Sequence, residues 1–569
     1  MNIDKLNPDK TDREKIINRW IGPVSLILLS TVMLFTGLSI RSLWGSEGRW
    51  AEIAREMIMS GNYFLPTING NVYFDKPLLS YWLILPFSLQ GVVTEFSSRL
   101  PSAISGIGVI LITFMMGSRL FNKMTGILSA MILSTTVMFI LWSRTASAEM
   151  LNVFMIWLAL LIFFTDNRRG NPIHIFLLYI IGAVAAFCKG PVAPAVIFIS
   201  IGFYSTAELF INLKNKGFTC ASFKERFYSE FYWIYSWKGL AGLLTGLTFF
   251  TGFLLAPVVL TGSWQSVELM WRENILRFLK PFDHIEPFYI YLKYIPLFSA
   301  PWTLFLIASI MELKKWEYSR LTRCIVIIAI SIFIFFTSSG SRRSYYILPI
   351  MPSLAIITGK VLSDWLDSEN PVRKKLIDMA AILTAILVTL AGTGLLLAYF
   401  HTGIPRHISQ LALGTTTIAA AAISFRLLLK QKQFRGFLTL FSIIFIIELW
   451  AFTIGMAVAE NNRTLLPFAK KTALQLQHVD DSKIAIYQLG DSALIFYLKR
   501  KPLKYYDNLA ALKDFIHKNP DGFIIAELNT ISSFQSENSL GTLIPIIIEK
   551  PVLKKKDDPI ALFAVSSKK

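Results

Sequence analysis

The chain has few charged residues and almost no cysteine. Asp, Glu, Lys and Arg make up 16% of its 569 residues and hydrophobic types 54%, whereas about 25% of residues are charged in soluble domains. Its three cysteines, Cys188, Cys220 and Cys324, have no metal-ligand spacing, so neither a zinc site nor a disulfide framework is expected. Internal repeats, which many transporters have, are missing, and the C-terminal tail has no nucleotide-binding glycine motif.

Long apolar runs are abundant instead. Thirteen of them reach about 20 residues, enough to cross a bilayer as helices, and they do not alternate as the strands of a membrane barrel do. We place them at roughly 21–40, 99–118, 123–142, 149–165, 173–188, 190–211, 240–262, 289–312, 323–339, 345–363, 376–400, 409–428 and 436–459. No small-residue cleavage site follows the first run, so it is expected to stay as a span.

The net charge of +19 is informative mainly through its placement. Lys and Arg gather before the first span and in every second connection after it, for example at Arg168 and Arg169. Basic residues collect in short cytoplasmic loops. The pattern therefore predicts a multi-pass protein of the bacterial inner membrane with a cytoplasmic N-terminus and a periplasmic C-terminus. Topology accounts for the charge, so membrane lipids are expected partners and nucleic acid is not.

The expected membrane domain covers residues 1–459 and contains a long periplasmic loop at 41–98. Within that loop, Arg49–Ser60 has apolar residues on one helical face and charged residues on the other, which predicts an interfacial helix. A second apolar stretch, Leu78–Leu89, is interrupted by Pro86 and is also expected to lie at the membrane surface.

The tail, residues 460–569, has its own pattern. Strand-like runs at 484–489, 522–528, 543–548 and 560–565 accompany a helical run at 509–517. The predicted fold is therefore an α-helical polytopic membrane protein with a small external α/β domain at its C-terminus.

Charged groups near a bilayer are costly, which makes those at the outer span ends functional candidates. They are Glu47, Arg49, Asp75, Lys76, Arg144, Glu149, Lys189, Arg272, Arg277, His284, Arg342 and Arg343. Cations outnumber acids, and several Arg and Lys at headgroup depth suit a phosphate or pyrophosphate. The carboxylates beside them suit a base, a metal or sugar hydroxyls.

Six blocks of sequence carry recognisable motifs. They are Trp44–Trp82, Ser97–Gly106 (SSRLPSAISG), Cys188–Pro194 (CKGPVAP), Trp271–Leu292, Ala300–Thr303 (APWT) and Ser341–Gly359. With thirteen spans and an external tail, they resemble the bacterial GT-C glycosyltransferases. These are relatives of protein O-mannosyltransferases and of the transferase that adds 4-amino-4-deoxy-L-arabinose to lipid A. The resemblance implies transfer of a sugar from a polyprenyl-phosphate donor to lipid A or another envelope glycan or protein.

The first block departs from the family pattern at one position. Many relatives have Asp-Glu-x-Arg where this chain has Ser46-Glu47-Gly48-Arg49. Either Glu47 takes over as the catalytic carboxylate, with Glu149 as the second candidate, or this chain uses different chemistry. A hydroxyl acceptor needs such a base, whereas a phosphate acceptor, already ionised, needs little help.

The remaining roles also come from the resemblance. Lys76 in the Asp75-Lys76-Pro77 motif is expected to bind the donor phosphate, together with Arg49, Lys189, Arg342, Arg343 and Tyr345. Asp75 and His284 are the candidate ligands of a divalent metal ion, although no complete metal site is visible in the sequence.

Two other function classes stay open. One is a transporter or flippase of lipid-linked saccharides, and the other is a non-catalytic assembly partner. The charges lie at one face of the membrane rather than at mid-span, which favours the transferase. The sugar, the acceptor, the stereochemistry and the oligomeric state are not fixed by the sequence.

Overall fold

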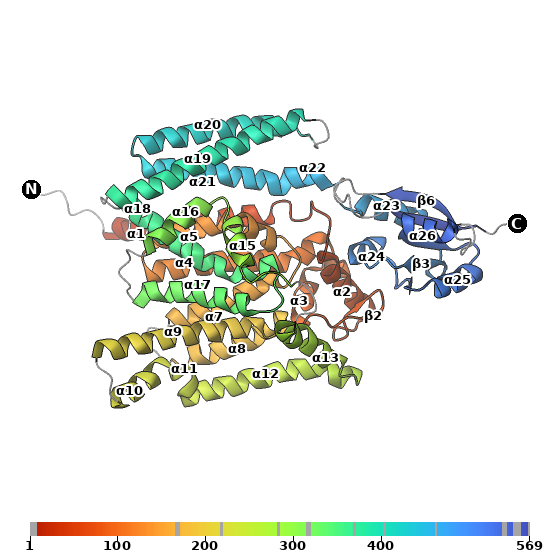
Figure 1. Ribbon diagram of the computed structural model, residues 1–569, viewed down its shortest axis with the longest axis horizontal. Coiled ribbons are helices and arrows are strands. Elements are labelled where there is room, and N and C mark those ends of the chain that lie inside the picture. Colours follow the sequence, from red (N-terminus) through yellow and green to blue (C-terminus); the bar gives the residue numbers. More distant parts are fainter. Residues whose placement is uncertain are drawn as a thin grey trace, which may run out of the picture. The chain divides into compact units, whose positions relative to one another are not determined.

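The computed structural model describes residues 8–165, 171–216, 220–280, 285–313, 320–367, 371–401, 406–460, 464–536, 543–549 and 559–566. The chain divides into two compact units (Figure 1). Unit 1 comprises Met1–Thr36, Asp75–Pro77 and Pro101–Trp450, and unit 2 comprises Gly37–Phe74, Leu78–Leu100 and Ala451–Lys569. The tail predicted as a separate domain thus shares a unit with most of the first outer loop.

Long apolar helices build unit 1 and run side by side in Figure 1. Eight helical segments of the described chain are long and apolar enough to cross a membrane. They lie in α4 (Glu95–Leu120), α8 (Pro172–Lys189), α9 (Val192–Lys216), α12 (Trp237–Thr261), η5 with α18 (Ser344–Ile350, Met351–Asp367), α19 (Pro371–Phe400), α20 (Ser409–Leu429), and α21 with η6 and α22 (Gln433–Trp450, Ala451–Gly455, Met456–Glu460).

Two further apolar segments are each made of a pair of helices joined at a bend. Helices α5 (Lys123–Ser134) and α6 (Val137–Ser143) meet at 69°, and α15 (Ile290–Phe298) and α16 (Thr303–Glu312) meet at 115°. Shorter apolar helices occur in α1 (Pro8–Phe35), α7 (Glu149–Thr165) and α17 (Arg320–Ser338). Each of the thirteen predicted runs thus coincides with a helix. The polytopic helical fold is confirmed, while the number of membrane crossings stays a prediction.

Small residues let these helices approach closely, as in membrane proteins generally. A Cβ added at Gly126 in α5 would lie 2.5 Å from the carbonyl oxygen of Phe114 in α4. A Cβ at Gly359 in α18 would lie 2.3 Å from Ser129 Oγ in α5. The central helices of unit 1 therefore pack backbone to backbone.

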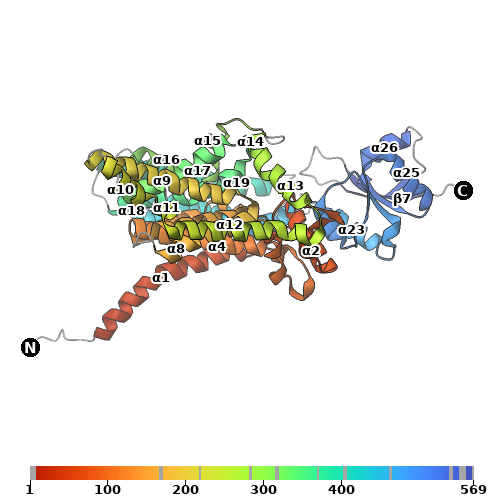
Figure 2. The ribbon, with the colours of Figure 1, turned by 90° about the horizontal axis from the view of Figure 1, so that it is seen from below.

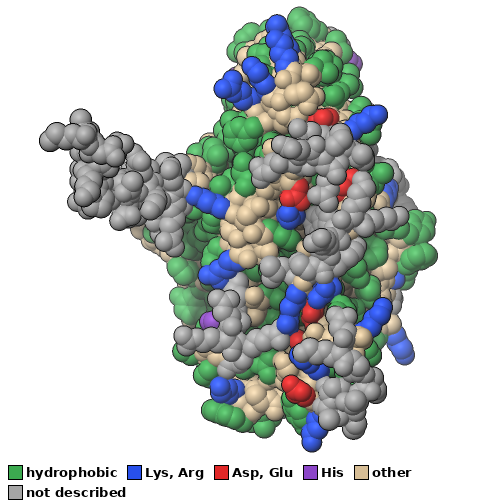
Figure 3. All heavy atoms as spheres, turned by 90° about the vertical axis from the view of Figure 1, so that its left-hand side faces the viewer, with side chains coloured by type: hydrophobic (Ala, Val, Ile, Leu, Met, Phe, Trp, Pro, Cys, Tyr) green, Lys and Arg blue, Asp and Glu red, His purple; other side chains and the backbone are tan. Residues whose placement is uncertain are grey.

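Short helices complete unit 1: α10 (Cys220–Glu230), α11 (Tyr232–Tyr235), α13 (Gln265–Trp271), η3 (Arg272–Leu276) and α14 (Arg277–Leu279). Near α10, Arg320 donates to Glu230 at 2.8 Å and Arg323 to Glu208 at 2.8 Å. On the face drawn in Figure 3, Lys and Arg side chains are scattered widely and Asp and Glu are few.

Unit 2 is organised around a five-stranded sheet of order β4-β3-β5-β7-β6. Its strands are β3 (Ile484–Tyr487), β4 (Lys504–Tyr506), β5 (Phe523–Glu527), β6 (Leu543–Glu549) and β7 (Ile560–Val565). Strand β3 is parallel to both β4 and β5, while β7 runs antiparallel to β5 and β6. The four predicted strands and the predicted helix, now α25 (Leu509–Lys518), are confirmed, and β4 is the strand that the sequence pattern missed.

Helices cover both faces of this sheet (Figure 2). One apolar core joins it to α23 (Leu466–Gln475) and α24 (Ser492–Leu498), and the other joins it to α25 and α26 (Leu528–Ser536). The 3₁₀ turn η7 (Asp481–Lys483) leads into β3. The C-terminal α/β domain is therefore a layered sheet with an apolar core on each face.

The first outer loop supplies the rest of unit 2. It forms α2 (Glu47–Ser60), the hairpin β1–β2 (Thr67–Ile68, Asn71–Val72), α3 (Leu79–Trp82), η1 (Leu85–Phe87) and η2 (Leu89–Gly91). Helix α2 packs against α24, and both its apolar and its acidic faces are buried, as Ile53, Glu52 and Glu56 show. The apolar face of α2 is therefore used inside the protein, and its position at the membrane surface stays a prediction.

Candidate active site

Four cationic side chains gather in unit 1, although they come from distant parts of the sequence. Lys76 lies in the Asp75–Pro77 segment, Lys189 ends α8, Arg277 begins α14 and Arg343 precedes η5. Lys76 and Arg343 are close enough to Lys189 for their charges to interact with it. A cluster of like charges is unfavourable by itself, so its members need anionic partners or an anionic ligand.

Three carboxylates lie among these cations. Lys76 Nζ donates to Asp75 Oδ1 at 2.9 Å, and Arg277 donates to Glu273 Oε2 at 2.8 Å. Lys189 Nζ donates to Glu149 Oε2, at the first turn of α7. Glu273 also lies beside Asp75, and burial together with this second carboxylate raises the pKa of Glu273.

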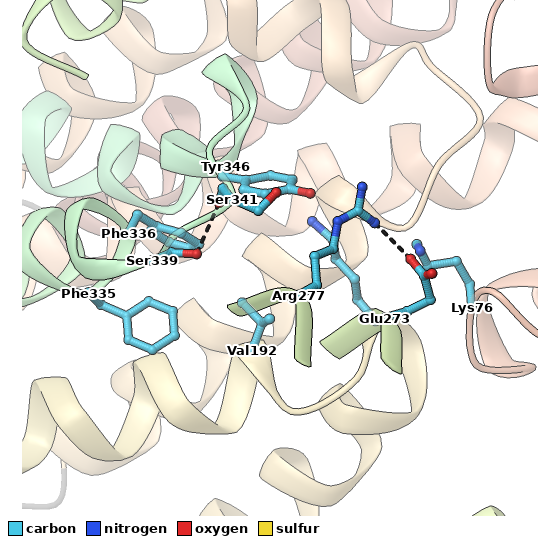
Figure 4. A pocket seen from close by; sticks show the side chains of 10 residues that line it. Lys76, Val192, Glu273, Arg277, Phe335, Phe336, Ser339, Ser341 and Tyr346 are labelled. Carbon is cyan, nitrogen blue, oxygen red and sulfur yellow. Dashed lines mark hydrogen bonds and ion pairs between the residues drawn. The ribbon is translucent and has the colours of Figure 1, made fainter. Parts of the chain in front are cut away.

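A pocket opens between these charges and an apolar wall (Figure 4). Lys76, Arg277 and Glu273 stand on one side of it, with Lys189 also lining the pocket. Phe335 and Phe336 stand on the other side, and Val192 lies between them and Arg277 in this view. The pocket can therefore hold a ligand that is anionic at one end and apolar at the other.

Aromatic and hydroxyl groups complete the lining. Lys189 Nζ lies 4.9 Å from the centre of the Tyr346 ring, a cation–π distance. Ser341 lines the same pocket, and within the described structure its buried Oγ has no hydrogen-bond partner. A ligand oxygen in the pocket can satisfy that hydroxyl.

The structure thus brings together most of the residues proposed from the sequence. Asp75, Lys76, Glu149, Lys189 and Arg343 belong to one cluster, and Arg343 donates to the Tyr345 hydroxyl at 2.8 Å. Arg342 instead donates to backbone carbonyls, those of Thr337 at 3.0 Å and Glu286 at 2.6 Å. This binding to the backbone gives Arg342 a role in holding the loop before η5.

Sequence reasoning gave no role to Glu273, Arg277 or Tyr346. Arg277 was recognised as a charge at an outer span end, and Glu273 lies four residues before it in the Trp271–Leu292 block. That i, i+4 spacing of opposite charges is a usable signal for a helical ion pair. Tyr346 adjoins a predicted residue, and no sequence signal separates the two tyrosines.

Two proposed residues, Glu47 and Arg49, belong to unit 2. The Glu47 side chain is 1% exposed and accepts from Arg99 Nε at 2.8 Å, from Arg99 Nη2 at 2.9 Å and from Arg41 at 2.8 Å. Arg99 also donates to the carbonyls of Leu38, Arg41 and Ser42. Glu47 is therefore enclosed by two arginines, a geometry that favours an anchoring role over proton transfer. Arg49 donates to the Tyr73 hydroxyl at 2.5 Å.

The residues proposed as metal ligands do not form a site in the described part of the chain. His284 lies outside the described residues. No group of three or more His, Cys, Asp and Glu side chains able to hold a metal occurs within them. Asp75 pairs with Lys76 in a cluster that is already rich in cations, and this positive charge disfavours the binding of a metal cation there.

Several described proteins are similar to this chain in sequence. Residues 75–217 match the family of dolichyl-phosphate-mannose-protein mannosyltransferases. An undecaprenyl phosphate-alpha-4-amino-4-deoxy-L-arabinose arabinosyl transferase of Shewanella sediminis is 26% identical over 404 residues, covering 69% of this chain and 68% of its own. A transferase with the same description from Pseudomonas fluorescens Pf0-1 is 23% identical over 521 residues, covering 87% and 84%.

The fold agrees with that of solved structures. The crystal structure of ArnT from Cupriavidus metallidurans bound to undecaprenyl phosphate superposes with a TM-score of 0.71 at 18% identity, covering 96% of this chain and 99% of the other. An oligosaccharyltransferase of Archaeoglobus fulgidus superposes with a TM-score of 0.51 at 10% identity.

The family match, the relatives and the shared fold support the resemblance to polytopic membrane glycosyltransferases of the GT-C class. The resemblance seen in the sequence motifs is thereby confirmed. Within this class, the curated relatives named above are described as arabinosyl transferases that use undecaprenyl phosphate.

Proposed function

We propose that the protein transfers a sugar from a polyprenyl-phosphate donor to lipid A on the periplasmic face of the bacterial inner membrane. The pocket of unit 1 carries this proposal, because its two sides match the two parts of the donor. Lys76, Lys189 and Arg277 suit the phosphate, and Val192, Phe335 and Phe336 suit the first isoprene units. The names of the relatives favour an amino-pentose as the sugar and undecaprenyl as the carrier.

The chemistry follows from the charges around the pocket. The bond between the anomeric carbon and the phosphate oxygen breaks, and a bond from that carbon to an acceptor oxygen forms. Negative charge then develops on the departing carrier phosphate, where preplaced cations stabilise it most. Lys76, Lys189 and Arg277 are placed to do this. Ion pairs with Asp75, Glu149 and Glu273 hold the three cationic side chains in position before the donor binds.

The acceptor sets the demand for a base. A hydroxyl acceptor must lose its proton, and Glu149 is our candidate to receive it, because its carboxylate lies within the cation cluster and pairs with Lys189. A phosphate acceptor is already ionised and leaves Glu149 only the task of positioning Lys189. Glu47 is assigned no proton, since two arginines hold it in unit 2.

Binding of undecaprenyl phosphate to the purified protein tests the donor site. Lys76→Ala removes one charge-assisted bond to phosphate, which is worth roughly 1.5–3 kcal/mol, or about tenfold to 150-fold in affinity. Lys214→Ala, a change on α9 outside the pocket, is the matched control and should leave affinity unchanged. Wild-type affinity in the Lys76 variant would remove that residue from the phosphate site.

Transfer itself needs a second assay. Radiolabelled polyprenyl-phosphate sugar and lipid A are mixed with the protein, and label in the lipid A fraction is measured. Movement of labelled donor across a vesicle membrane without cleavage of the sugar–phosphate bond would contradict a transferase and indicate a flippase.

A further inference from the structure

Unit 2 contains a second pocket, separate in composition from the charged pocket of unit 1. It is lined by Leu43–Gly45, by Thr464–Leu466 and by Asp491, Ala493, Leu494 and Tyr497. Its walls are mainly apolar, with polar groups on Asp491, Thr464 and Tyr497, and no Lys or Arg lines it among the described residues. A phosphate is therefore a poor ligand for this pocket, since a lone carboxylate repels it.

The pocket lies near the carboxyl end of β3, the edge of the sheet at which α/β domains bind ligands. Strands β3 and β5 are parallel neighbours, and the chain leaves β3 for α24 on one face of the sheet. It leaves β5 for α26 on the opposite face. Ligands of open α/β sheets bind beyond the carboxyl ends of strands at such a switch point. Asp491 follows β3 by four residues and so stands at that edge.

The carboxylate of Asp491 is held in place and keeps one oxygen for a ligand. Its Oδ1 accepts from the backbone N–H groups of Ala493 at 2.9 Å and Leu494 at 3.2 Å, which fixes the side chain at the start of α24. Within the described chain, no hydrogen bond engages Oδ2. An ionised carboxylate only accepts hydrogen bonds, so the ligand must donate, as hydroxyl groups do.

The aromatic residue Trp44 also lines the pocket, on a loop that is held through its backbone. Trp44 is 49% exposed. The backbone N–H of Trp44 donates to Glu47 Oε2 at 3.3 Å, and the backbone N–H of Leu43 donates to the Tyr497 hydroxyl at 2.7 Å. The buried Glu47 and its arginines thereby fix the loop that carries Trp44. A half-exposed aromatic ring on a rigid loop is a preformed surface for an apolar face of a ligand.

From this arrangement we infer that the pocket of unit 2 binds an uncharged, hydroxyl-bearing sugar ring of the glycan acceptor. Sugar rings combine apolar C–H faces, which can lie on Trp44, with hydroxyl donors, which can reach Asp491 and Thr464. The donor is already assigned to the charged pocket of unit 1, where Lys76, Lys189 and Arg277 suit its phosphate, which leaves this pocket for the acceptor. The inference rests on the proposed function for the identity of the acceptor, and it gives unit 2 the task of selecting that acceptor.

Saturation-transfer NMR on the detergent-solubilised full chain tests the site directly. The probe is the N-acetylated, dephosphorylated glucosamine disaccharide of lipid A. Asp491→Asn keeps the cap of α24, because Asn is an equally good cap, but removes the charge and should weaken binding about tenfold. Trp44→Ala should weaken it at least as much. Asp514→Asn, an exposed carboxylate on α25, is the control and should change nothing.

Kinetics separates the acceptor from the donor. In Asp491→Asn we expect the KM for lipid A to rise about tenfold, while kcat and the affinity for undecaprenyl phosphate stay at wild-type values. Equal disaccharide binding by the wild type and both variants would overturn the inference, as would binding of the free amino-pentose or a fatty acid in place of the disaccharide. Disaccharide binding is measured without turnover. A protein that transfers no sugar would therefore refute the proposed function, while the binding measurement would still show whether this pocket binds the disaccharide.

Discussion

Replacing Glu47 by Gln separates an anchoring role from a catalytic one. The substitution keeps the shape of the side chain and removes its charge, leaving Arg41 and Arg99 buried without their shared anion. Breaking a buried ion pair from one side costs about 3–5 kcal/mol. A single domain is stable by about 5–15 kcal/mol, so unit 2 should lose a large part of its stability.

Thermal unfolding of the detergent-solubilised protein measures this loss. A unit of this size changes its Tm by about 2–4 °C per kcal/mol, so Glu47→Gln should lower the transition of unit 2 by about 6–20 °C. Asp514→Asn removes an exposed charge from the same unit and is the control. The double variant Glu47→Gln with Arg99→Met should lose less than the sum of the single variants, because the two groups interact.

A general base behaves differently. If Glu47 takes a proton in the reaction, Glu47→Gln should unfold at the wild-type temperature, and turnover should fall by about 10²–10⁴ with donor binding intact. That combination would refute the anchoring role and would require the carboxylate to leave both arginines during catalysis.

Other predictions concern catalysis, pH and topology. Glu149→Gln should lower turnover on a hydroxyl acceptor by about 10²–10⁴ while undecaprenyl phosphate still binds; the control is Glu225→Gln on α10, and full activity would remove Glu149 as base. Burial raises the pKa of Glu52 from 4.5 to about 7. The folded state therefore holds a proton that the unfolded state releases, so stability should fall by up to about 3 kcal/mol as pH rises from 4.5 to 7. Glu52→Gln should flatten that dependence in unfolding measured across this range, and an unchanged slope would contradict it. A reporter active only in the cytoplasm, fused after Lys569, should be silent, and activity there would reverse the predicted topology.

The spans and the charged cluster could be predicted because each depends on a signal that the sequence carries locally. An apolar run of about 20 residues predicts a membrane helix, and the basic loops place alternate helix ends on the same side of the membrane. Asp75, Lys76, Glu149 and Lys189 follow from those two rules, since all four lie at ends assigned to the same side.

The role of Glu47 could not be found in this way. Glu47 lies 52 positions before Arg99, which donates two hydrogen bonds to it. No periodic pattern in the sequence links the two residues. The burial of α2 was missed for the same reason, because its partner α24 lies in the tail. An amphipathic face shows that a helix packs on something apolar, and it does not distinguish lipid from protein.

The joint between the first outer loop and the tail bears on how the protein is made. Asn69 exchanges two hydrogen bonds with the backbone of Leu503, which is 434 positions later, and a Cβ at Gly48 would lie 2.3 Å from the N atom of Ala493. The loop therefore has no partner until the ribosome has delivered nearly the whole chain. If the membrane helices insert as they are made, the loop stays without its partner until the tail has been synthesised. A chain that stops before α24 should accordingly reach the membrane with an exposed loop, a form that proteases of the cell envelope can recognise and remove.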